Sequence, residues 1–225
     1  MTATKSIYLQ ILMTATLIVL VIMLFEFTNL DLVIQSHFYN FTTHSWLVTD
    51  QDFWLWLVLY KGVKICIVVF GVGLIIVYIR RARQELLLLI LAIALVPILI
   101  GLGKKTSNIH CPSAIEYFNG DKPYVRLFGT YPADFVQIKP GKCYPAGHAS
   151  GGFALMALFF FFKRKSYRYF GLALGIALGW IMGFYQITKG AHFFSDTVVT
   201  MLVAWLVILL LRLLTHTPAS PVCSN

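Results

Sequence analysis

The chain has 225 residues, of which 59% are hydrophobic and 12% are charged, and its formal net charge is +9. With a mean hydropathy of +0.78, this composition excludes an ordinary soluble domain and indicates a membrane protein. The positive charge does not indicate a nucleic-acid partner, because the sequence has no basic stripe with interleaved aromatic residues. No repeat or linker divides the sequence, so we expect one domain over residues 1–225.

Six apolar segments approach or reach the roughly 20 residues that a helix needs to cross a bilayer. They cover residues 7–28, 54–79, 85–103, 149–162, 170–187 and 196–214. The fourth is short and begins with Ala149-Ser150-Gly151-Gly152, which favours packing against other helices over contact with lipid. The first is too long for a signal peptide and no cleavage site follows it. The sequence therefore predicts an all-α polytopic membrane protein with six transmembrane helices.

Positive charges are distributed unevenly among the connections between these segments. They gather before the first segment, in the second and fourth connections and at the end of the sixth segment: Lys5, Arg80, Arg81, Arg83, Lys163, Arg164, Lys165, Arg168 and Arg212. If six helices alternate in direction, all of these fall on one side, which the positive-inside rule identifies as cytoplasmic. Both termini are then cytoplasmic, and residues 29–53, 104–148 and 188–195 face outward.

Two of the outward segments have recognisable features. Residues 31–39 mix apolar and polar side chains, which is typical of a short helix at the membrane interface. The segment 104–148 is rich in proline and in turn residues, so we expect a long and mostly irregular loop. A loop of this length usually has a function. Its surplus of lysine and arginine fits either an anionic substrate or contact with anionic head groups.

Cys111 and Cys143 both lie in this outer loop, where an oxidising compartment would allow them to pair. A disulfide that closes the loop would contribute roughly 3–4 kcal/mol by chain entropy. The sequence leaves open whether the bond forms. It offers no convincing ligand cluster for a metal, because His110 and Cys111 alone are too small a set.

The stretch His192-Phe193-Phe194-Ser195-Asp196 leads into the sixth segment. At positions i and i+4 of a helix, the Asp196 carboxylate can reach one imidazole nitrogen of His192. That contact fixes the tautomer and leaves the other nitrogen as a base or nucleophile. A helix-starting histidine with an acidic first turn is the alternative. The position beside Lys189, on the same side as a second histidine, favours catalysis.

The second histidine, His148, follows Pro145-Ala146-Gly147 and opens the fourth segment. Gly147 would allow backbone amides to approach an anion closely, and His148 could then protonate a departing alkoxide. Lys104 and Lys105 end the third segment. They either neutralise phosphate oxygens or snorkel to the interface. These residues predict a site on the outer face that cleaves a phosphate ester.

The same residues resemble the three motifs of the membrane type-2 phosphatidic acid phosphatase (PAP2) superfamily, which are Lys-x6-Arg-Pro, Pro-Ser-Gly-His and Ser-Arg-x5-His-x3-Asp. The first motif reads Lys104-x6-Cys111-Pro112 here, the second reads Pro145-Ala146-Gly147-His148, and the third keeps His192-x3-Asp196 but has Tyr185-Gln186 in place of Ser-Arg. The resemblance covers about residues 54–214 and implies a PAP2-like bundle with a long periplasmic loop. It also implies that two phosphate-binding arginines of the family are missing.

Longer stretches are similar to a bacterial subgroup of the superfamily. This subgroup carries His-Cys-Pro, here residues 110–112, and Pro-Ala-Gly-His-Ala-Ser-Gly-Gly, here residues 145–152. Residues 118–122 and 190–196 are similar to lipid A phosphatases of the superfamily. The resemblance therefore implies a protein of the bacterial inner membrane with its active site on the periplasmic face.

The resemblance implies a role for each matching residue. His192 would attack the phosphorus, Asp196 would orient it, and His148 would protonate the leaving group and later activate water. Other cations must stand in for the missing arginines, and Lys189, Lys105 and Lys142 are the candidates. Lysine supplies the charge but not the bidentate fork of arginine. No metal or other cofactor is implied.

The leading hypothesis is a phosphatase acting on a lipid phosphate or diphosphate, such as undecaprenyl diphosphate, lipid A or a phosphatidic-acid-type lipid. A phosphotransferase that passes the phosphoryl group to another lipid is a close alternative. A catalytically silent lipid-binding protein is a third. Lys61 and Lys64 in the second segment are the only hint of a transporter, and snorkelling explains them equally well. The sequence gives no indication of oligomeric state.

Overall fold

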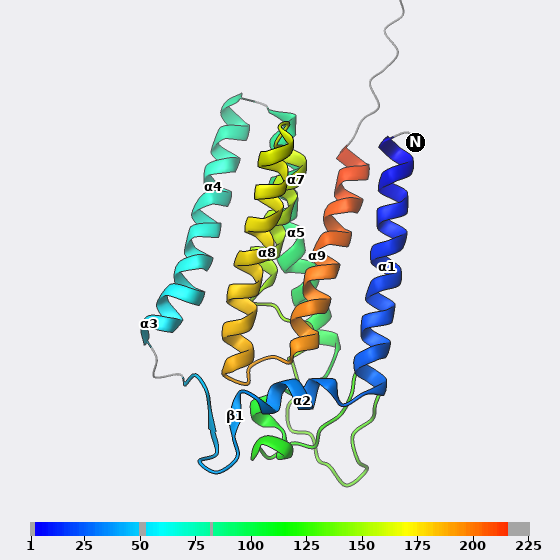
Figure 1. Ribbon diagram of the computed structural model, residues 1–225, viewed down its shortest axis with the longest axis vertical. Coiled ribbons are helices and arrows are strands. Elements are labelled where there is room, and N and C mark those ends of the chain that lie inside the picture. The colour runs from blue at the N-terminus through cyan, green and yellow to red at the C-terminus, as the bar shows by residue number, and fades with distance from the viewer. Residues whose placement is uncertain (1–2, 50–52, 82, 216–225) are drawn as a thin grey trace, which may run out of the picture.

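The computed structural model describes residues 3–49, 53–81 and 83–215 and is a bundle of helices standing on a layer of loops (Figure 1). Within these residues, five helices are long and apolar enough to span a membrane. They are α1 (Ala3–Phe27), the continuous helix formed by α3 (Phe53–Trp56), the π-helical turn η1 (Leu57–Gly62) and α4 (Val63–Arg81), then α5 (Leu87–Thr106), α8 (Lys165–Thr188) and α9 (Phe194–Thr215). A short 3-10 turn, η2 (Gln84–Leu86), precedes α5.

The predicted span at residues 149–162 is the one that differs from expectation. It forms α6 (Ser150–Ala154), the 3-10 turn η5 (Leu155–Ala157) and α7 (Leu158–Phe161), which have 5, 3 and 4 residues. At 1.5 Å per residue these turns cover about 18 Å, less than the roughly 30 Å of a bilayer core. The non-helical chain before α6 enters the bundle and continues into these short helices.

Backbone contacts with α9 hold this entering chain in place. The amide of Ala146 donates to the carbonyl oxygen of Asp196 at 3.3 Å, and the hydroxyl of Thr200 donates to the carbonyl oxygen of Ala146 at 3.2 Å. Irregular backbone is tolerated at membrane depth only where other protein groups satisfy it. Further along, a side chain at Gly152 would overlap the backbone of Gly179 on α8, so glycine allows α6 and α8 to pack closely.

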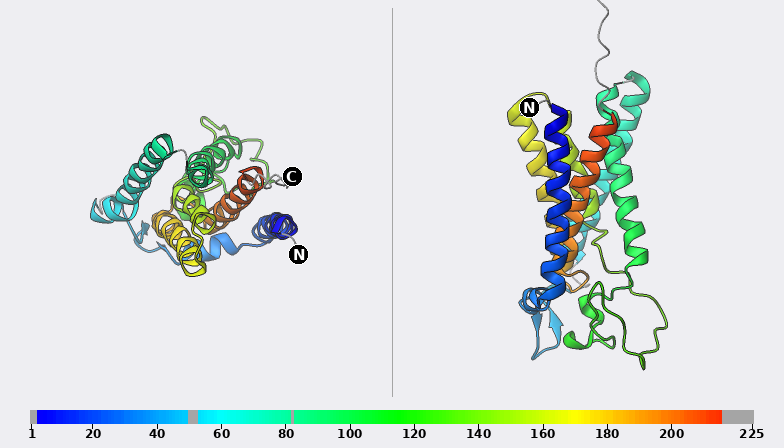
Figure 2. Two further views of the ribbon diagram at one scale, coloured as in Figure 1. Left: turned by 90° about the horizontal axis from the view of Figure 1, so that it is seen from above. Right: turned by 90° about the vertical axis from the view of Figure 1, so that its right-hand side faces the viewer.

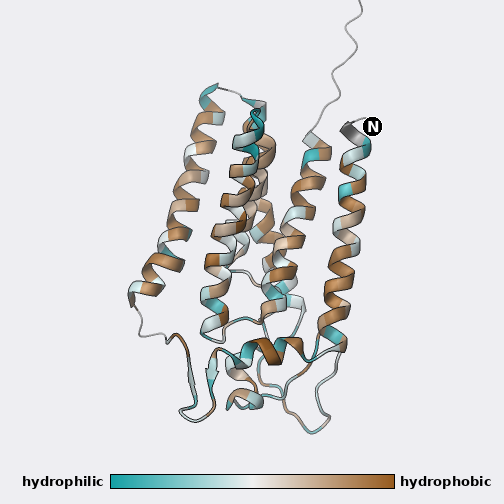
Figure 3. Ribbon diagram, in the orientation of Figure 1, coloured by the Kyte–Doolittle hydropathy of each residue, from teal (hydrophilic) through white to brown (hydrophobic). Residues whose placement is uncertain are grey.

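The short helices α6 and α7 lie at the centre of the bundle, with α4, α5, α8 and α9 around them, and α1 packs on the outside of α9 (Figure 2). The buried core includes Leu89, Val96 and Ile100 of α5, Phe153 of α6 and Ile208 of α9. Apolar residues also cover the outer surfaces of α1 and α4 along most of their length (Figure 3). These surfaces suit contact with lipid rather than water.

One end of the bundle carries nearly all of the non-helical chain, and we call it the loop end. It contains α2 (Leu30–Ser36), a two-stranded hairpin of β1 (Tyr39–Asn40) and β2 (Ser45–Trp46), and the 3-10 turns η3 (Pro112–Ala114) and η4 (Glu116–Phe118). Helix α2 overlaps the interfacial helix predicted for residues 31–39 but ends at Ser36, and the hairpin was not predicted. The first and last described residues lie at the opposite end (Figure 1).

Cys111 and Cys143 form a disulfide that ties the long loop together at its base. Beside it, the amide of Cys143 donates to the carbonyl oxygen of Ile109 at 2.9 Å. The loop also contacts the N-terminal part of the chain, because Arg126 donates to the side-chain oxygen of Asn29 at 2.6 Å. The disulfide therefore holds the two ends of the loop together, and Arg126 ties its middle to the connection between α1 and α2.

Candidate active site

His192 lies on a tight turn between α8 and α9. Helix α8 ends before Gly190, whose φ of 70° is in the left-handed region, and the amide of Ala191 donates to the carbonyl oxygen of Gln186 at 2.9 Å. This arrangement is typical of a helix that ends on glycine. A side chain at Gly190 would also overlap the ring of Trp46. Glycine is therefore required here, and it turns the chain so that His192 points into the bundle.

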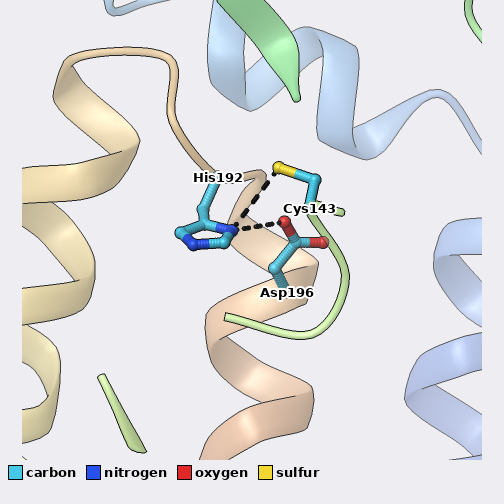
Figure 4. Close-up of side chains that lie close together, drawn as sticks. All are labelled: Cys143, His192 and Asp196. Carbon is cyan, nitrogen blue, oxygen red and sulfur yellow. Dashed lines mark hydrogen bonds and ion pairs between the residues drawn. The ribbon is translucent and has the colours of Figure 1, made fainter. Parts of the chain in front are cut away.

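Asp196, in the first turn of α9, fixes the orientation of His192 (Figure 4). The carboxylate oxygen Oδ2 lies 3.1 Å from Nδ1 of His192 and accepts a hydrogen bond from the amide of Phe193 at 3.0 Å. Both side chains are buried, with 1% of each residue exposed. Because a carboxylate can only accept, Nδ1 of His192 carries the proton and Nε2 presents a lone pair.

His148 meets that lone pair from the opposite side. Its Nδ1 atom lies 3.1 Å from Nε2 of His192, and the two ring centroids are 5.3 Å apart. With Nε2 as the acceptor, the proton of this hydrogen bond belongs to His148. The structure thus brings His148 to the pair formed by His192 and Asp196, which lies more than forty residues further along the chain.

Both imidazoles are neutral in this environment. Burial lowers the pKa of His192, and burial together with the neighbouring His192 lowers the pKa of His148. The positive charges of Lys104, Lys64 and Lys189 lower the pKa of His148 further. A neutral imidazole is the form that can act as a nucleophile.

A cavity of about 460 Å³ opens beside His148 between α4, α5, α6 and α8. Its polar side chains are those of Lys104, Lys64, His148, Ser150 and Tyr60, and the rest of its wall is mainly apolar. The ring of Tyr60 packs edge-on against His148 with centroids 5.1 Å apart. This combination of a few convergent polar groups with apolar walls is typical of a binding site for a small or amphipathic ligand.

The predicted cations differ in their distance from this cavity. Lys104 is partly buried and lines it together with Gly147. Lys189, at the end of α8, lies with its ammonium 5.5 Å from the ring centre of Tyr185 and exerts its charge on His148. Lys105 and Lys142 are exposed and are not among the residues that line the cavity. The structure therefore places Lys104 at the cavity beside His148, while Lys189 acts on His148 through its charge and Lys105 and Lys142 are exposed.

The sequence did not identify Lys64 and Tyr60 as part of the site. They lie four residues apart on the helix that runs from η1 into α4, and both reach the cavity beside His148. The available signal was a lysine inside an apolar segment, which is a candidate functional residue in a membrane protein.

Two residues of α2 were also missed. Asp31 accepts hydrogen bonds from the amide of Ser195, at 3.0 Å, and from its hydroxyl group, whereas Gln35 donates to the carbonyl oxygen of Ile187 at 2.8 Å. Burial, reinforced by the nearby charge of Asp196, raises the pKa of Asp31 to about 7. The α2 helix thus holds both ends of the turn that carries His192.

Cys143, His192 and Asp196 lie close enough together to suggest a metal site by distance alone. The sulfur of Cys143, 3.5 Å from Nδ1 of His192, is already bonded to Cys111. A disulfide sulfur is not the thiolate ligand that zinc requires. The proton on Nδ1 of His192 also faces the same point. This donor set does not fit a metal ion.

Comparison with known proteins gives a family match and a distant relative. The model of the PAP2 superfamily matches residues 85–219. The lipid A 4'-phosphatase of Francisella tularensis subsp. novicida (strain U112) is 24% identical over 184 residues, which cover 76% of this chain and 80% of that protein. No solved structure is significantly similar to the chain. The region matched by the family model contains Lys104, His148, His192 and Asp196 but excludes α2 and α4.

Proposed function

This chain belongs to the PAP2 superfamily, and on that premise we propose that it is a membrane lipid phosphatase that works through a phosphohistidine on His192. The observation that supports this most directly is the row formed by Asp196, His192 and His148. Nδ1 of His192 is held by Asp196, while Nε2 faces Nδ1 of His148 at 3.1 Å. The proposed nucleophile and its orienting group are therefore buried, and the half-buried proton donor lies next to them.

In the first step, Nε2 of His192 attacks the phosphorus, the P–N bond forms and the P–O bond to the lipid breaks. The departing oxygen takes a proton from Nδ1 of His148. A bound phosphate dianion would counteract the charges of the nearby lysines and raise the pKa of His148. In the complex His148 would then be a protonated imidazolium, which can give up the proton on Nδ1. Asp196 stabilises the positive charge that develops on His192.

In the second step, His148 acts as the base. It takes a proton from a water molecule, the resulting hydroxide attacks the phosphorus, and the P–N bond breaks to release inorganic phosphate. His192 returns to its neutral form with the proton still on Nδ1. Lys104 would neutralise charge on the phosphoryl oxygens in both steps, and Gly147 would let them approach the cavity wall closely.

The cavity supports a lipid substrate, because its walls are mainly apolar and lie between helices that face the bilayer. Undecaprenyl diphosphate, lipid A and phosphatidic-acid-type lipids all fit this description. The distant relative named lipid A 4'-phosphatase favours a lipid A phosphate among them.

We also propose that the loop end faces the periplasm of a bacterial cell, with the chain working as a single domain in the inner membrane. Basic residues at the ends of α4 and α9 and at the start of α8, namely Arg80, Arg81, Lys165 and Arg212, lie at the end of the bundle away from His192. The positive-inside rule then makes that end cytoplasmic.

Phosphate release from a panel of lipid phosphates tests the proposed function. Purified protein in detergent micelles should release phosphate from at least one lipid, and His192→Ala and His148→Ala should each reduce release by orders of magnitude. Unchanged release in these variants would refute the catalytic assignment. Phosphate recovered on a second lipid rather than in solution would identify a phosphotransferase.

A further inference from the structure

In this chain the family motifs supply fewer positive charges than they do in the family. The two positions where the family has arginine are occupied by Cys111, which is in a disulfide, and by Gln186, which is buried and neutral. Of the motif residues, Lys104 is the cation that lines the cavity beside His148. A phosphate monoester carries close to two negative charges at neutral pH, and in a largely apolar cavity these need compensating cations.

Lys64 is placed to supply one of these charges. It lines the same cavity as Lys104 and His148, and its charge acts on the His148 imidazole. Tyr60, four residues earlier, packs against the ring of His148, so this face of the helix lies against the proposed proton donor. Tyr60 lies in the η1 turn, which is a π-helix, and π-helical turns often occur at functional sites.

Lys61, three residues earlier on the same helix, has a different environment from Lys64. Its ammonium lies 4.7 Å from the ring centre of Trp56, near the start of the helix, and it is not among the residues that line the His148 cavity. Lys64 lies further into the membrane-spanning helix. Among the residues that the structure describes, no aspartate or glutamate forms an ion pair with Lys64. A charge at such a position is costly unless it has a function.

We propose that Lys64 binds the phosphate group of the substrate and, together with Lys104, replaces the charge of the missing arginines. This inference rests on the proposed phosphatase function and extends it to a residue outside the region matched by the family model. The ligand is the dianionic phosphate of a lipid monoester, held between α4 and α5. Lysine binds it as a point charge rather than as a bidentate fork.

Paired substitutions on the same helix test this role. Lys64→Met removes the charge at the cavity, whereas Lys61→Met makes the same change three positions earlier, beside Trp56. Loss of one charged contact to phosphate should lower kcat/KM by about 10- to 100-fold for Lys64→Met, with Lys61→Met close to wild type. Lys64→Arg should retain most of the activity because it keeps the charge. The inhibition constant of inorganic phosphate should rise in Lys64→Met and not in Lys61→Met.

Equal kcat/KM and equal phosphate inhibition in Lys64→Met and Lys61→Met would overturn the inference. Thermal unfolding in detergent shows whether each variant is folded. If Lys64→Met does not fold, Lys64→Gln takes its place, because its polar side chain keeps most of the length. Parallel measurement of His192→Ala separates the two claims. An inactive His192→Ala beside a fully active Lys64→Met refutes the role of Lys64 alone, whereas an active His192→Ala refutes the phosphatase mechanism itself.

Discussion

Nδ1 of His148 lies 3.1 Å from Nε2 of His192, so the proposed proton donor caps the lone pair of the proposed nucleophile. A tetrahedral phosphorus cannot fit between two atoms at this distance. Attack by His192 therefore requires the two rings to separate. His192 is fixed by Asp196 and fully buried, whereas His148 borders the cavity and contacts Tyr60. We expect His148 to be the ring that moves.

The tautomer of His192 should depend on Asp196. In Asp196→Asn, the side-chain amide can donate to Nδ1 of His192, which moves the ring proton to Nε2 and removes the nucleophilic lone pair. By analogy with the same change in serine hydrolases, kcat should fall by about 10³- to 10⁴-fold. Steady-state kinetics measure this loss, and near-wild-type thermal unfolding would show that the fold is intact. An Asp196→Asn variant with normal kcat would contradict the assigned tautomer.

Asp31 should make stability depend on pH. Because its pKa in the folded protein is raised to about 7 from 3.8, the folded state binds more protons than the unfolded state between these values. The associated stability is fully present below 3.8 and is lost as the pH rises through about 7, with a slope of at most about 1.4 kcal/mol per pH unit.

Asp31→Asn tests this dependence, because asparagine keeps an acceptor for Ser195 but does not titrate. Thermal unfolding in detergent across this pH range should give a flatter profile for Asp31→Asn than for wild type. The variant should gain stability relative to wild type as the pH rises. Parallel profiles for the two proteins would show that Asp31 has an ordinary pKa.

The α2 helix should matter for catalysis as well as for folding. Gln35 donates to the carbonyl oxygen of Ile187 at the end of α8, just before the turn that carries His192. Gln35→Leu removes this bond and leaves a buried carbonyl without that donor, which costs about 1–3 kcal/mol. We expect a lower unfolding temperature and a lower kcat. Gln10→Leu on α1 is a matched control, because among the described residues the Gln10 side chain donates to Ser6 of its own helix. Equal kcat in the two variants would argue against a positioning role for α2.

The disulfide between Cys111 and Cys143 should support both the loop and the site, because Cys143 lies against the ring of His192. Replacing both cysteines with serine should cost about 2–5 kcal/mol of stability and reduce activity. A reducing agent should have the same effect on the wild type and none on the double variant. Cys66→Ser, at a free cysteine on α4, controls for cysteine replacement in general. Insensitivity of the wild type to reduction would contradict the prediction.

Hydropathy and basic connections predicted six spanning helices, and five of these segments form single helices that are long and apolar enough to span a membrane. They could not predict how the chain crosses near residues 143–161. Hydropathy counts apolar residues without distinguishing a helix from an extended chain, and Pro145 to Ala149 is extended or turned rather than helical. The short central helix follows from that difference.

The two histidines and Asp196 were identified from motif spacing, whereas Lys64 and Asp31 were not. The sequence does not distinguish a lysine that packs on an aromatic ring, as Lys61 does on Trp56, from one that lines the cavity beside His148, as Lys64 does. The direction in which each lysine side chain points depends on the rotation of the helix about its axis, which the π-helical turn η1 alters. Asp31 and Gln35 become part of the site only through contacts with α8 and α9, more than a hundred residues away.

Trapping the phosphohistidine tests the proposed mechanism most directly. Rapid alkaline quenching of His148→Ala with radiolabelled nitrophenyl phosphate should capture it, because this leaving group needs no protonation but the hydrolysis step still lacks its base. In His148→Ala we expect alkali-stable label on the peptide that contains His192, in larger amount than in wild type. We expect no label in His192→Ala. Label on another residue, or label that persists in His192→Ala, would contradict the mechanism.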